Sequence, residues 1–134
     1  MLSACDDPFL ITAGGKLSGP ISEVPTVWQL GEASTVAQLE TRPNDPYSIN
    51  LTYVQLNGRL YVYAGDTQTN WVAAMEQDPL VRIRISGTVY PARAIRITDQ
   101  REIEAFADFW ASRSMFQRDP MQFDEVWLYH LVAR

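Results

Sequence analysis

Apolar and polar residues alternate along several short segments of the chain, as they do in strands that bury one face. These predicted strands cover residues 35–41, 48–56, 59–64, 80–86, 89–97 and 125–132. Asn57 and Gly58 separate the second segment from the third, and Asn-Gly between two alternating runs is the strongest short signal for a hairpin. The alternation therefore predicts an antiparallel sheet.

Two other segments have the spacing of amphipathic helices. The first covers residues 70–77 with Trp71 on its apolar face, and the Asp78-Pro79 pair ends it because a residue before proline avoids the α region. The second begins at Asp99, which is followed three residues later by glutamate, the spacing of a capping box. Strands and helices in this order predict an α+β domain. Its antiparallel sheet curls around one core, with one short mid-chain helix and one longer helix before the last strand.

The N-terminal part of the chain has a different composition. Residues 6–34 are rich in glycine and proline and predict a loop-rich lead-in, with one short strand near residues 26–30. We therefore divide the chain into an extended lead-in over residues 1–24 and a barrel domain over residues 25–134. A total of 134 residues is one domain on the usual size scale, and a hydrophobic content of 46% is enough for a single core.

Charge and residue counts exclude several classes of function. The net charge of −5 leaves no basic field for nucleic acid or anionic lipid. No apolar run approaches the ~20 residues of a membrane helix. With one cysteine and one histidine, the chain has neither a cysteine metal cluster nor a site with several histidines, so no metal is predicted. His130 and the tryptophans are interpreted as packing residues, and no pair of side chains has the spacing of a nucleophile with its base.

The segment LSAC at residues 2–5 matches the lipobox of bacterial lipoproteins, in which the cysteine becomes the lipidated first residue. On this interpretation Cys5 carries a lipid anchor. The two aspartates that follow it resemble a retention signal for the inner membrane, so the protein lies in the cell envelope on the periplasmic face. The alternative is an exposed thiol in a frayed terminus of a cytoplasmic protein. Contact with a membrane is expected only through this anchor.

The central stretch RPNDPYSINLTYVQLNGRLYVYAGDTQTNWVAAMEQDPLVRIRI, residues 42–85, resembles a known fold. Its hairpin, glycine-containing polar loop, short helix with tryptophan, Asp-Pro and V-x-I-x-I strand are similar to the middle of the split β-barrel flavin-binding superfamily. Pyridoxamine-phosphate oxidases and deazaflavin-dependent nitroreductases share that fold. The resemblance covers roughly residues 35–134. It implies an antiparallel split barrel, a homodimer with a ligand groove across its interface, and FMN or a deazaflavin as cofactor.

The same resemblance implies which residues would contact the cofactor, through the polar loop and strand after residue 41 and through the loop and helix after residue 64. They are Arg42, Ser48, Asn50, Gly65, Asp66, Thr67, Asn70 and Trp71. Redox chemistry would reside in the cofactor, and no catalytic side chain is assigned. The helical spacing offers a second interpretation of Trp71, as a core or dimer packing residue.

The sequence also departs from the pattern of the superfamily. The first loop is rich in lysine, arginine and glycine in the nitroreductases, but here Arg42 is its only cation and Asp45 adds an anion. Pro43 and Pro46 remove two backbone donors, and Ala74 stands where the family has asparagine. Absence of any cofactor is therefore an equal alternative.

Four arginines on the two strands after the short helix are further candidates for anion binding. Arg82 and Arg84 share one face of their strand, whereas Arg93 and Arg96 point to opposite faces of theirs. Pro91, which cannot donate to a neighbouring strand, predicts an edge or a bulge there, and a bulge would bring both onto one face. The arginines then form a cationic stripe for phosphate or carboxylate. The alternative, which we favour, is a solvated face that pairs with the excess acids.

Two functional hypotheses follow from the sequence. The first is a flavin- or deazaflavin-binding small-molecule oxidoreductase at the cell envelope. The second is a non-catalytic lipoprotein that binds a ligand or partner and keeps the barrel without the cofactor site, because function resides in the site rather than in the fold.

Overall fold

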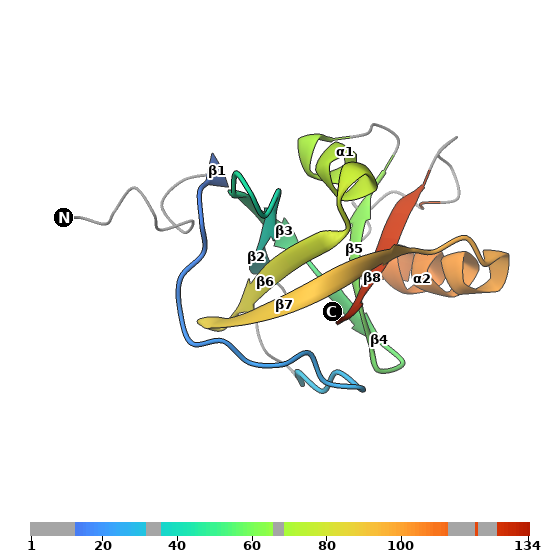
Figure 1. The fold of residues 1–134 in the computed structure, drawn as a ribbon. Coiled ribbons are helices and arrows are strands. Elements are labelled where there is room, and N and C mark those ends of the chain that lie inside the picture. Colours follow the sequence, from blue (N-terminus) through green and yellow to red (C-terminus); the bar gives the residue numbers. More distant parts are fainter. Residues whose placement is uncertain (1–12, 32–35, 66–68, 113–119, 121–125) are drawn as a thin grey trace.

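The computed structural model describes residues 13–31, 36–65, 69–112, 120 and 126–134 (Figure 1). Its elements are β1 (Ala13–Gly14), β2 (Val36–Thr41), β3 (Tyr47–Thr52), β4 (Val54–Leu56), β5 (Arg59–Ala64), α1 (Asn70–Gln77), β6 (Leu80–Ile85), β7 (Thr88–Arg96), α2 (Gln100–Ser112) and β8 (Trp127–Ala133). The strands form one antiparallel eight-stranded sheet in the order β1-β3-β2-β6-β7-β8-β5-β4. This confirms the predicted α+β split barrel, with the short helix mid-chain and the longer helix before the last strand.

The strand pairing changes at Tyr53. The single strand predicted over residues 48–56 is divided there, so that β3 pairs with β2 while β4 pairs with β5. These two pairings lie near opposite ends of the strand order. Because one residue separates the two halves, a single stretch of backbone joins both sides of the sheet. Tyr53 itself is 2% exposed and packs in the inner core.

The inner face of the curled sheet holds the main core, as the alternation predicts. Its members include Leu39, Leu60, Ile83 and Leu131. Helix α1 covers one end of this core with Trp71, Val72 and Met75, which are all buried (Figure 1). The packing interpretation of Trp71 is therefore confirmed.

Local signals set the bounds of α1 as predicted. Thr69 is the N-cap, and its hydroxyl accepts the backbone N–H of Val72 at 3.4 Å. Asp78 has extended backbone at the other end, as a residue before proline should. The predicted hairpin is also confirmed, because Asn57 and Gly58 both have positive φ, 55° and 80°, between β4 and β5.

Helix α2 covers part of the outer face of the sheet. Phe106 is fully buried against Tyr61 and Leu128, which point away from the inner core. Phe106 also packs on Tyr63 and Trp110, with ring centroids 5.2 and 5.7 Å away. The barrel therefore has a second, smaller apolar cluster outside the sheet.

The end of the barrel opposite α1 is closed by residues 15–31, which we call the strap. It runs around the lower edge of the sheet in Figure 1 and forms no strand at residues 26–30, so that prediction was wrong. Trp28 is 3% exposed within the inner core and packs edge-on against Tyr90 at 5.1 Å. Its indole N–H donates to the carbonyl of Leu131 at 3.3 Å, and its backbone N–H to Gly58 at 2.9 Å.

The strap also pairs with the start of β7. The N–H of Val89 donates to the carbonyl of Pro20 at 2.8 Å, and Ser22 donates to the carbonyl of Val89 at 2.9 Å. At Gly19 the strap passes so close to the turn after β6 that a Cβ atom would lie 2.5 Å from the carbonyl oxygen of Gly87. Glycine is required there because φ is also positive, at 139°.

The prediction of a bulge at Pro91 was wrong. The registers of β7 with β6 and with β8 are continuous, so Arg93 and Arg96 keep opposite parity. The alternative prediction, that Pro91 lies at a strand edge, holds on the β8 side. The pairing of β7 with β8 ends at Ala92, which lies opposite Ala133. Pro91 therefore interrupts no hydrogen bond to β8.

We expect Trp28→Ala to lower the free energy of unfolding by about 3 to 5 kcal/mol, the usual cost of deleting a buried large aromatic side chain. Trp110→Ala, at a half-buried position on α2, serves as the control and should cost less. Urea denaturation followed by circular dichroism measures both. Equal losses would show that the strap does not help to close the core.

Candidate functional site

The predicted cofactor residues lie on different sides of the sheet. Ser48 and Asn50 alternate in β3 with Ile49 and Leu51, which pack on the inner core. Ser48 and Asn50 therefore face outward. Trp71 packs on the inner core from α1. The structure thus brings Ser48 and Asn50 together and separates them from Trp71.

Arg42 is held by its own loop. Its backbone has a positive φ of 56°, and its guanidinium lies 3.8 Å from the carboxylate of Asp45 and 4.9 Å from the ring centre of Tyr47. This pair is exposed and contributes little to stability. The pair shows, however, that the predicted phosphate-binding cation already has an anionic partner.

The remaining members of the predicted set come from the second loop. Asp66 and Thr67 lie outside the described residues. Gly65 is half-buried where β5 ends, and Asn70 is exposed at the first position of α1. Of these two, Asn70 directly precedes the buried Trp71 on α1.

A buried ion pair lies on the outer face beside Ser48. Arg82 donates from Nε and Nη2 to the two carboxylate oxygens of Glu40 at 2.9 and 3.0 Å, a two-point pairing across β2 and β6. Leu17 of the strap adds its N–H to Glu40 at 2.7 Å, and its carbonyl accepts from Arg82 at 2.7 Å. Only 6% of the Glu40 side chain and 14% of the Arg82 side chain are exposed.

Of the two predicted cofactor contacts on this face, Ser48 is buried beside the ion pair, whereas Asn50 is exposed. Ser48 lies opposite Glu40 in the β2–β3 register and is 1% exposed, without a hydrogen-bond partner for its hydroxyl. The neighbouring Gln38 is also 1% exposed, and its amide nitrogen has no partner. The Ser48 hydroxyl is therefore buried beside the ion pair and is not open to a flavin phosphate in this structure.

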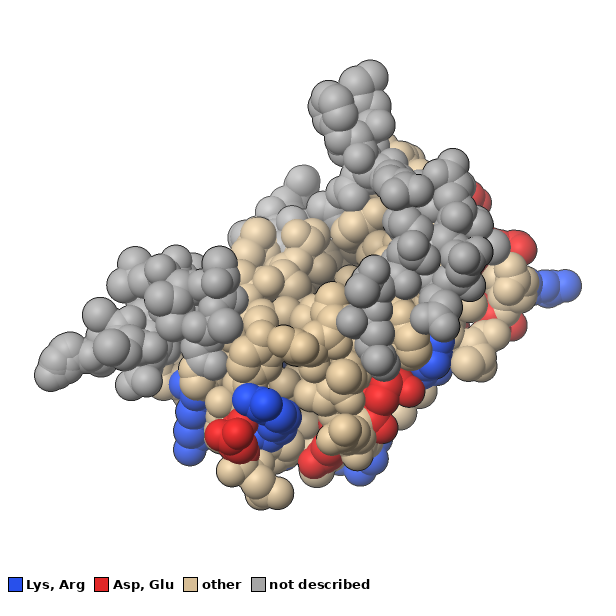
Figure 2. Space-filling view, turned by 90° about the horizontal axis from the view of Figure 1, so that it is seen from above, with Lys and Arg blue, Asp and Glu red and all other residues tan. Residues whose placement is uncertain are grey.

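The cationic stripe is not formed. Arg82 is already paired with Glu40. Arg84 and the exposed Arg93 lie on the same outer face as Arg82. Arg96 lies on the opposite face, where it stacks on Trp127 at 4.1 Å and lies 4.0 Å from the carboxylate of Glu76. The expectation of a wholly solvated face was also incomplete, because the Arg82 pair is buried. On the face seen in Figure 2, acidic and basic side chains lie side by side along the rim.

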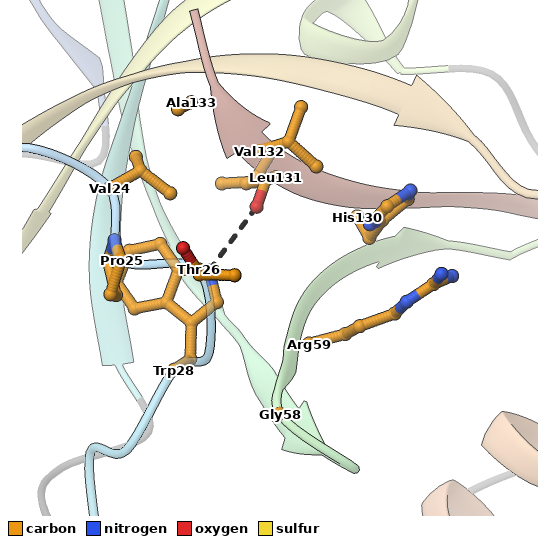
Figure 3. Close-up of a pocket in the computed structure, with 10 residues that line it drawn as sticks. All are labelled: Val24, Pro25, Thr26, Trp28, Gly58, Arg59, His130, Leu131, Val132 and Ala133. Carbon is orange, nitrogen blue, oxygen red and sulfur yellow. Dashed lines mark hydrogen bonds between the residues drawn. The ribbon is translucent and has the colours of Figure 1, made fainter.

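An open pocket of about 420 Å³ lies between the strap and β8 (Figure 3). Its lining residues are Val24, Pro25, Thr26, Trp28, Gly58, Arg59, His130, Leu131, Val132 and Ala133. The first residue of β5 is Arg59, and β8 supplies His130 from the outer face, where it pairs with Tyr61 of β5. In Figure 3 the Arg59 and His130 side chains extend to the same side of the pocket.

Arg59 also belongs to a network with α2. Its Nη1 donates to the carboxylate of Glu102 at 2.6 Å, and the Tyr61 hydroxyl donates to the same oxygen. Burial would raise the pKa of Glu102, but the hydrogen bonds from Tyr61 and Arg59 outweigh it and hold that pKa below its usual value. Burial, followed by the hydrogen bond to Glu102, raises the pKa of Tyr61.

His130 is affected by the same surroundings. Burial, followed by the positive charge of Arg59, lowers the pKa of His130 below 6.5, and the charge of Glu102 opposes this only in part. At pH 7 the imidazole is therefore neutral and has one N–H donor and one acceptor nitrogen.

A second polar cluster lies where β8 begins. The Tyr129 hydroxyl donates to the carboxylate of Glu76 of α1. Burial, and then this hydrogen bond, raises the pKa of Tyr129. The indole nitrogen of Trp127 is buried without a partner beside the guanidinium of Arg96. These contacts attach α1 to the end of the sheet.

Two classes of site are not seen in the described part of the chain. No group of three or more His, Cys, Asp or Glu residues there could hold a metal ion. No helix among those residues is long and apolar enough to cross a membrane.

Comparisons with known proteins identify the fold. No family model matches the sequence. No curated protein matches it either. A putative pyridoxamine 5′-phosphate oxidase from Listeria innocua is 14% identical, with a TM-score of 0.56 over 75% of this chain and 84% of the other. An FAD-binding protein from Mesorhizobium loti is 16% identical, with a TM-score of 0.56 over 75% and 80%.

A protein of unknown function from Agrobacterium tumefaciens is 20% identical, with a TM-score of 0.53 over 75% of this chain and 48% of the other. At these identities the likeness shows the fold alone. The chain therefore has the split-barrel fold of pyridoxamine-phosphate-oxidase-like and flavin-binding proteins, as the resemblance implied.

Sequence reasoning missed Glu40 and Arg59 and left His130 as a packing residue. Glu40 carries a weak signal, because a glutamate alternates there with buried residues in a strand. No local pattern indicates Arg59 beside His130, because β5 and β8 meet only through the long-range register that pairs Tyr61 with His130.

His130 is the only histidine, so NMR can follow its titration directly. We expect its pKa to lie below 6.5, and Arg59→Gln should raise it while burial keeps it below 6.5. Because the unfolded histidine takes up its proton at higher pH, the contribution of His130 to stability is present above pH 6.5 and is lost as the pH falls through the folded pKa. Arg101→Gln, at an exposed position of α2, is the control and should leave the titration unchanged.

A pKa at or above 6.5 in the unmodified protein would contradict the surroundings described for His130. An equal shift in both variants would show that the proximity of Arg59 is not the cause.

Proposed function

We propose that this chain is a non-catalytic binding protein, which keeps the split barrel of flavin proteins without their phosphate-binding site. The observation that carries the proposal is the buried Glu40–Arg82 pair, which the backbone of Leu17 covers. It occupies the face on which Ser48 and Asn50 would meet a cofactor. The open pocket beside Arg59 and His130 is the surface on which a small ligand is expected.

The cost of separating Glu40 from Arg82 supports the proposal that no phosphate enters between them. Removing one partner of a buried ion pair costs about 3 to 5 kcal/mol, because the other charge remains uncompensated in a low-dielectric site. A cofactor phosphate that displaced Glu40 from Arg82 would meet this cost and would also break both hydrogen bonds to Leu17. Arg42 is an exposed cation whose charge Asp45, 3.8 Å away, offsets only weakly.

The second candidate function is a flavin- or deazaflavin-dependent oxidoreductase of small molecules. The specific observation in its favour is the likeness in fold to a putative pyridoxamine 5′-phosphate oxidase and to an FAD-binding protein. The redox chemistry would reside in the bound flavin. This candidate also requires a homodimer, because the superfamily resemblance implies a groove built across a subunit interface.

Titration of the purified chain into FMN, FAD or a deazaflavin decides between these functions. We expect a colourless protein and no quenching of flavin fluorescence, because the buried Glu40–Arg82 pair occupies the face beside Ser48. Glu40→Gln, which keeps the shape of the side chain but frees Arg82 from its anion, is the informative variant. A gain of FMN binding in that variant alone would show that Glu40 excludes the phosphate.

A yellow protein, or tight quenching by the unmodified chain, would reject the non-catalytic proposal and support the oxidoreductase. Sedimentation on the same sample tests the homodimer. A single species at the monomer mass of 15.2 kDa would contradict the dimeric groove.

We also propose that Cys5 carries a lipid that tethers the protein to the periplasmic face of the inner membrane. The support is the LSAC pattern at residues 2–5 and the acidic pair after it. Labelling of cells with a palmitate analogue, using the native gene with all its upstream coding sequence, should mark the protein. Cys5→Ser should abolish the label and release the protein from the membrane fraction. An unlabelled native protein would place it in the cytoplasmic alternative.

A further inference from the structure

The pocket between the strap and β8 has one apolar side and one polar side. Val24 and Pro25 from the strap and Val132 from β8 supply aliphatic surface. Arg59 and His130 lie together on the other side (Figure 3). Its volume of about 420 Å³ lies within the range of small-molecule sites, about 300 to 1,000 Å³.

Arg59 can bind a further group without losing its contact with α2. Only its Nη1 is engaged by Glu102, while a guanidinium has five N–H donors in a fixed planar arrangement. The side chain remains 48% exposed. Glu102 lies on the α2 side and accepts from Tyr61 as well. Arg59 therefore lines the pocket with donors beyond the one that Glu102 accepts, although the charge of Glu102 moderates its field.

His130 adds a neutral donor to the same side. Its ring belongs to the outer face of β8, between Tyr61 of β5 and Ile95 of β7 in the register. A neutral imidazole carries one N–H, which can donate to an anionic oxygen. A guanidinium and an imidazole N–H form a suitable pair of donors for one planar carboxylate or one sulfonate.

We propose that this pocket binds a small amphipathic organic anion. Its carboxylate or sulfonate head is held by Arg59 and His130, and its apolar body lies against Val24, Pro25 and Val132. Affinity comes from burial of the apolar body together with a charge-assisted hydrogen bond to the head. The inference rests on the proposed binding function and names its ligand class.

Calorimetric titration of the full chain with 1-naphthoate tests the proposal, and 1-naphthylmethanol serves as the neutral molecule with the same apolar body. We expect 1-naphthoate to bind about tenfold or more tightly than the alcohol, the range of a hydrogen bond to a charged group. The NMR resonances of His130 should shift along the same binding curve, which locates the probe.

Two pairs of variants identify the residues. Arg59→Gln should weaken 1-naphthoate by about tenfold, while Arg101→Gln, outside this pocket, should not. Val132→Glu places a negative charge among the lining residues and should also weaken the binding of the anionic 1-naphthoate. Val132→Gln has a side chain of similar size without the charge and should retain binding. The second pair keeps the proposal testable if Arg59→Gln, which also loses Glu102, fails to fold.

The outcomes separate this inference from the proposed function. Equal affinity for 1-naphthoate and 1-naphthylmethanol would contradict the inference that the pocket selects an anion. It would not contradict the proposal that the chain is a binding protein. Failure of 1-naphthoate to bind at about 5 mM, beyond the weak millimolar range, would overturn the pocket as an anion site. Tight flavin binding by the unmodified protein would instead reject the proposed function, whatever 1-naphthoate does.

Discussion

The segment from Tyr47 to Leu56 pairs with β2 through its first half and with β5 through its second half, and the rest of the structure depends on this double pairing. By joining the two sides of the sheet it encloses an inner face that stays open at both ends. Apolar surface left in water costs about 25 cal/mol per Å². Helix α1 covers one end, and Trp28 of the strap covers the other.

The path of the strap has two consequences for function. To reach the open end, it crosses the outer face of the sheet, where the backbone of Leu17 meets Glu40 and Arg82. Further along, Trp28 holds the strap against β8 and leaves an open pocket beside Arg59. The covered ion pair and the open pocket are therefore both results of the need to close the barrel.

Split barrels are compatible with more than one function, because the fold supplies a scaffold and individual side chains supply the chemistry. Here the resemblance correctly implied the scaffold. The residues that it implied for a cofactor are divided between the outer face, which carries Ser48 and Asn50, and the inner core, which contains Trp71. On the outer face the Ser48 hydroxyl is buried without a hydrogen-bond partner.

The sequence by itself determined the bounds of α1 and the turn at Asn57-Gly58, because caps, proline and positive φ act within a few residues. Alternation likewise indicated most strands and which side chains enter the core. Only the tertiary structure decided that the predicted strand is interrupted at Tyr53 and that Glu40 is buried with Arg82, 42 residues away. Partners across a sheet depend on register and closure, and these are set by the packing of the whole chain rather than by any local pattern.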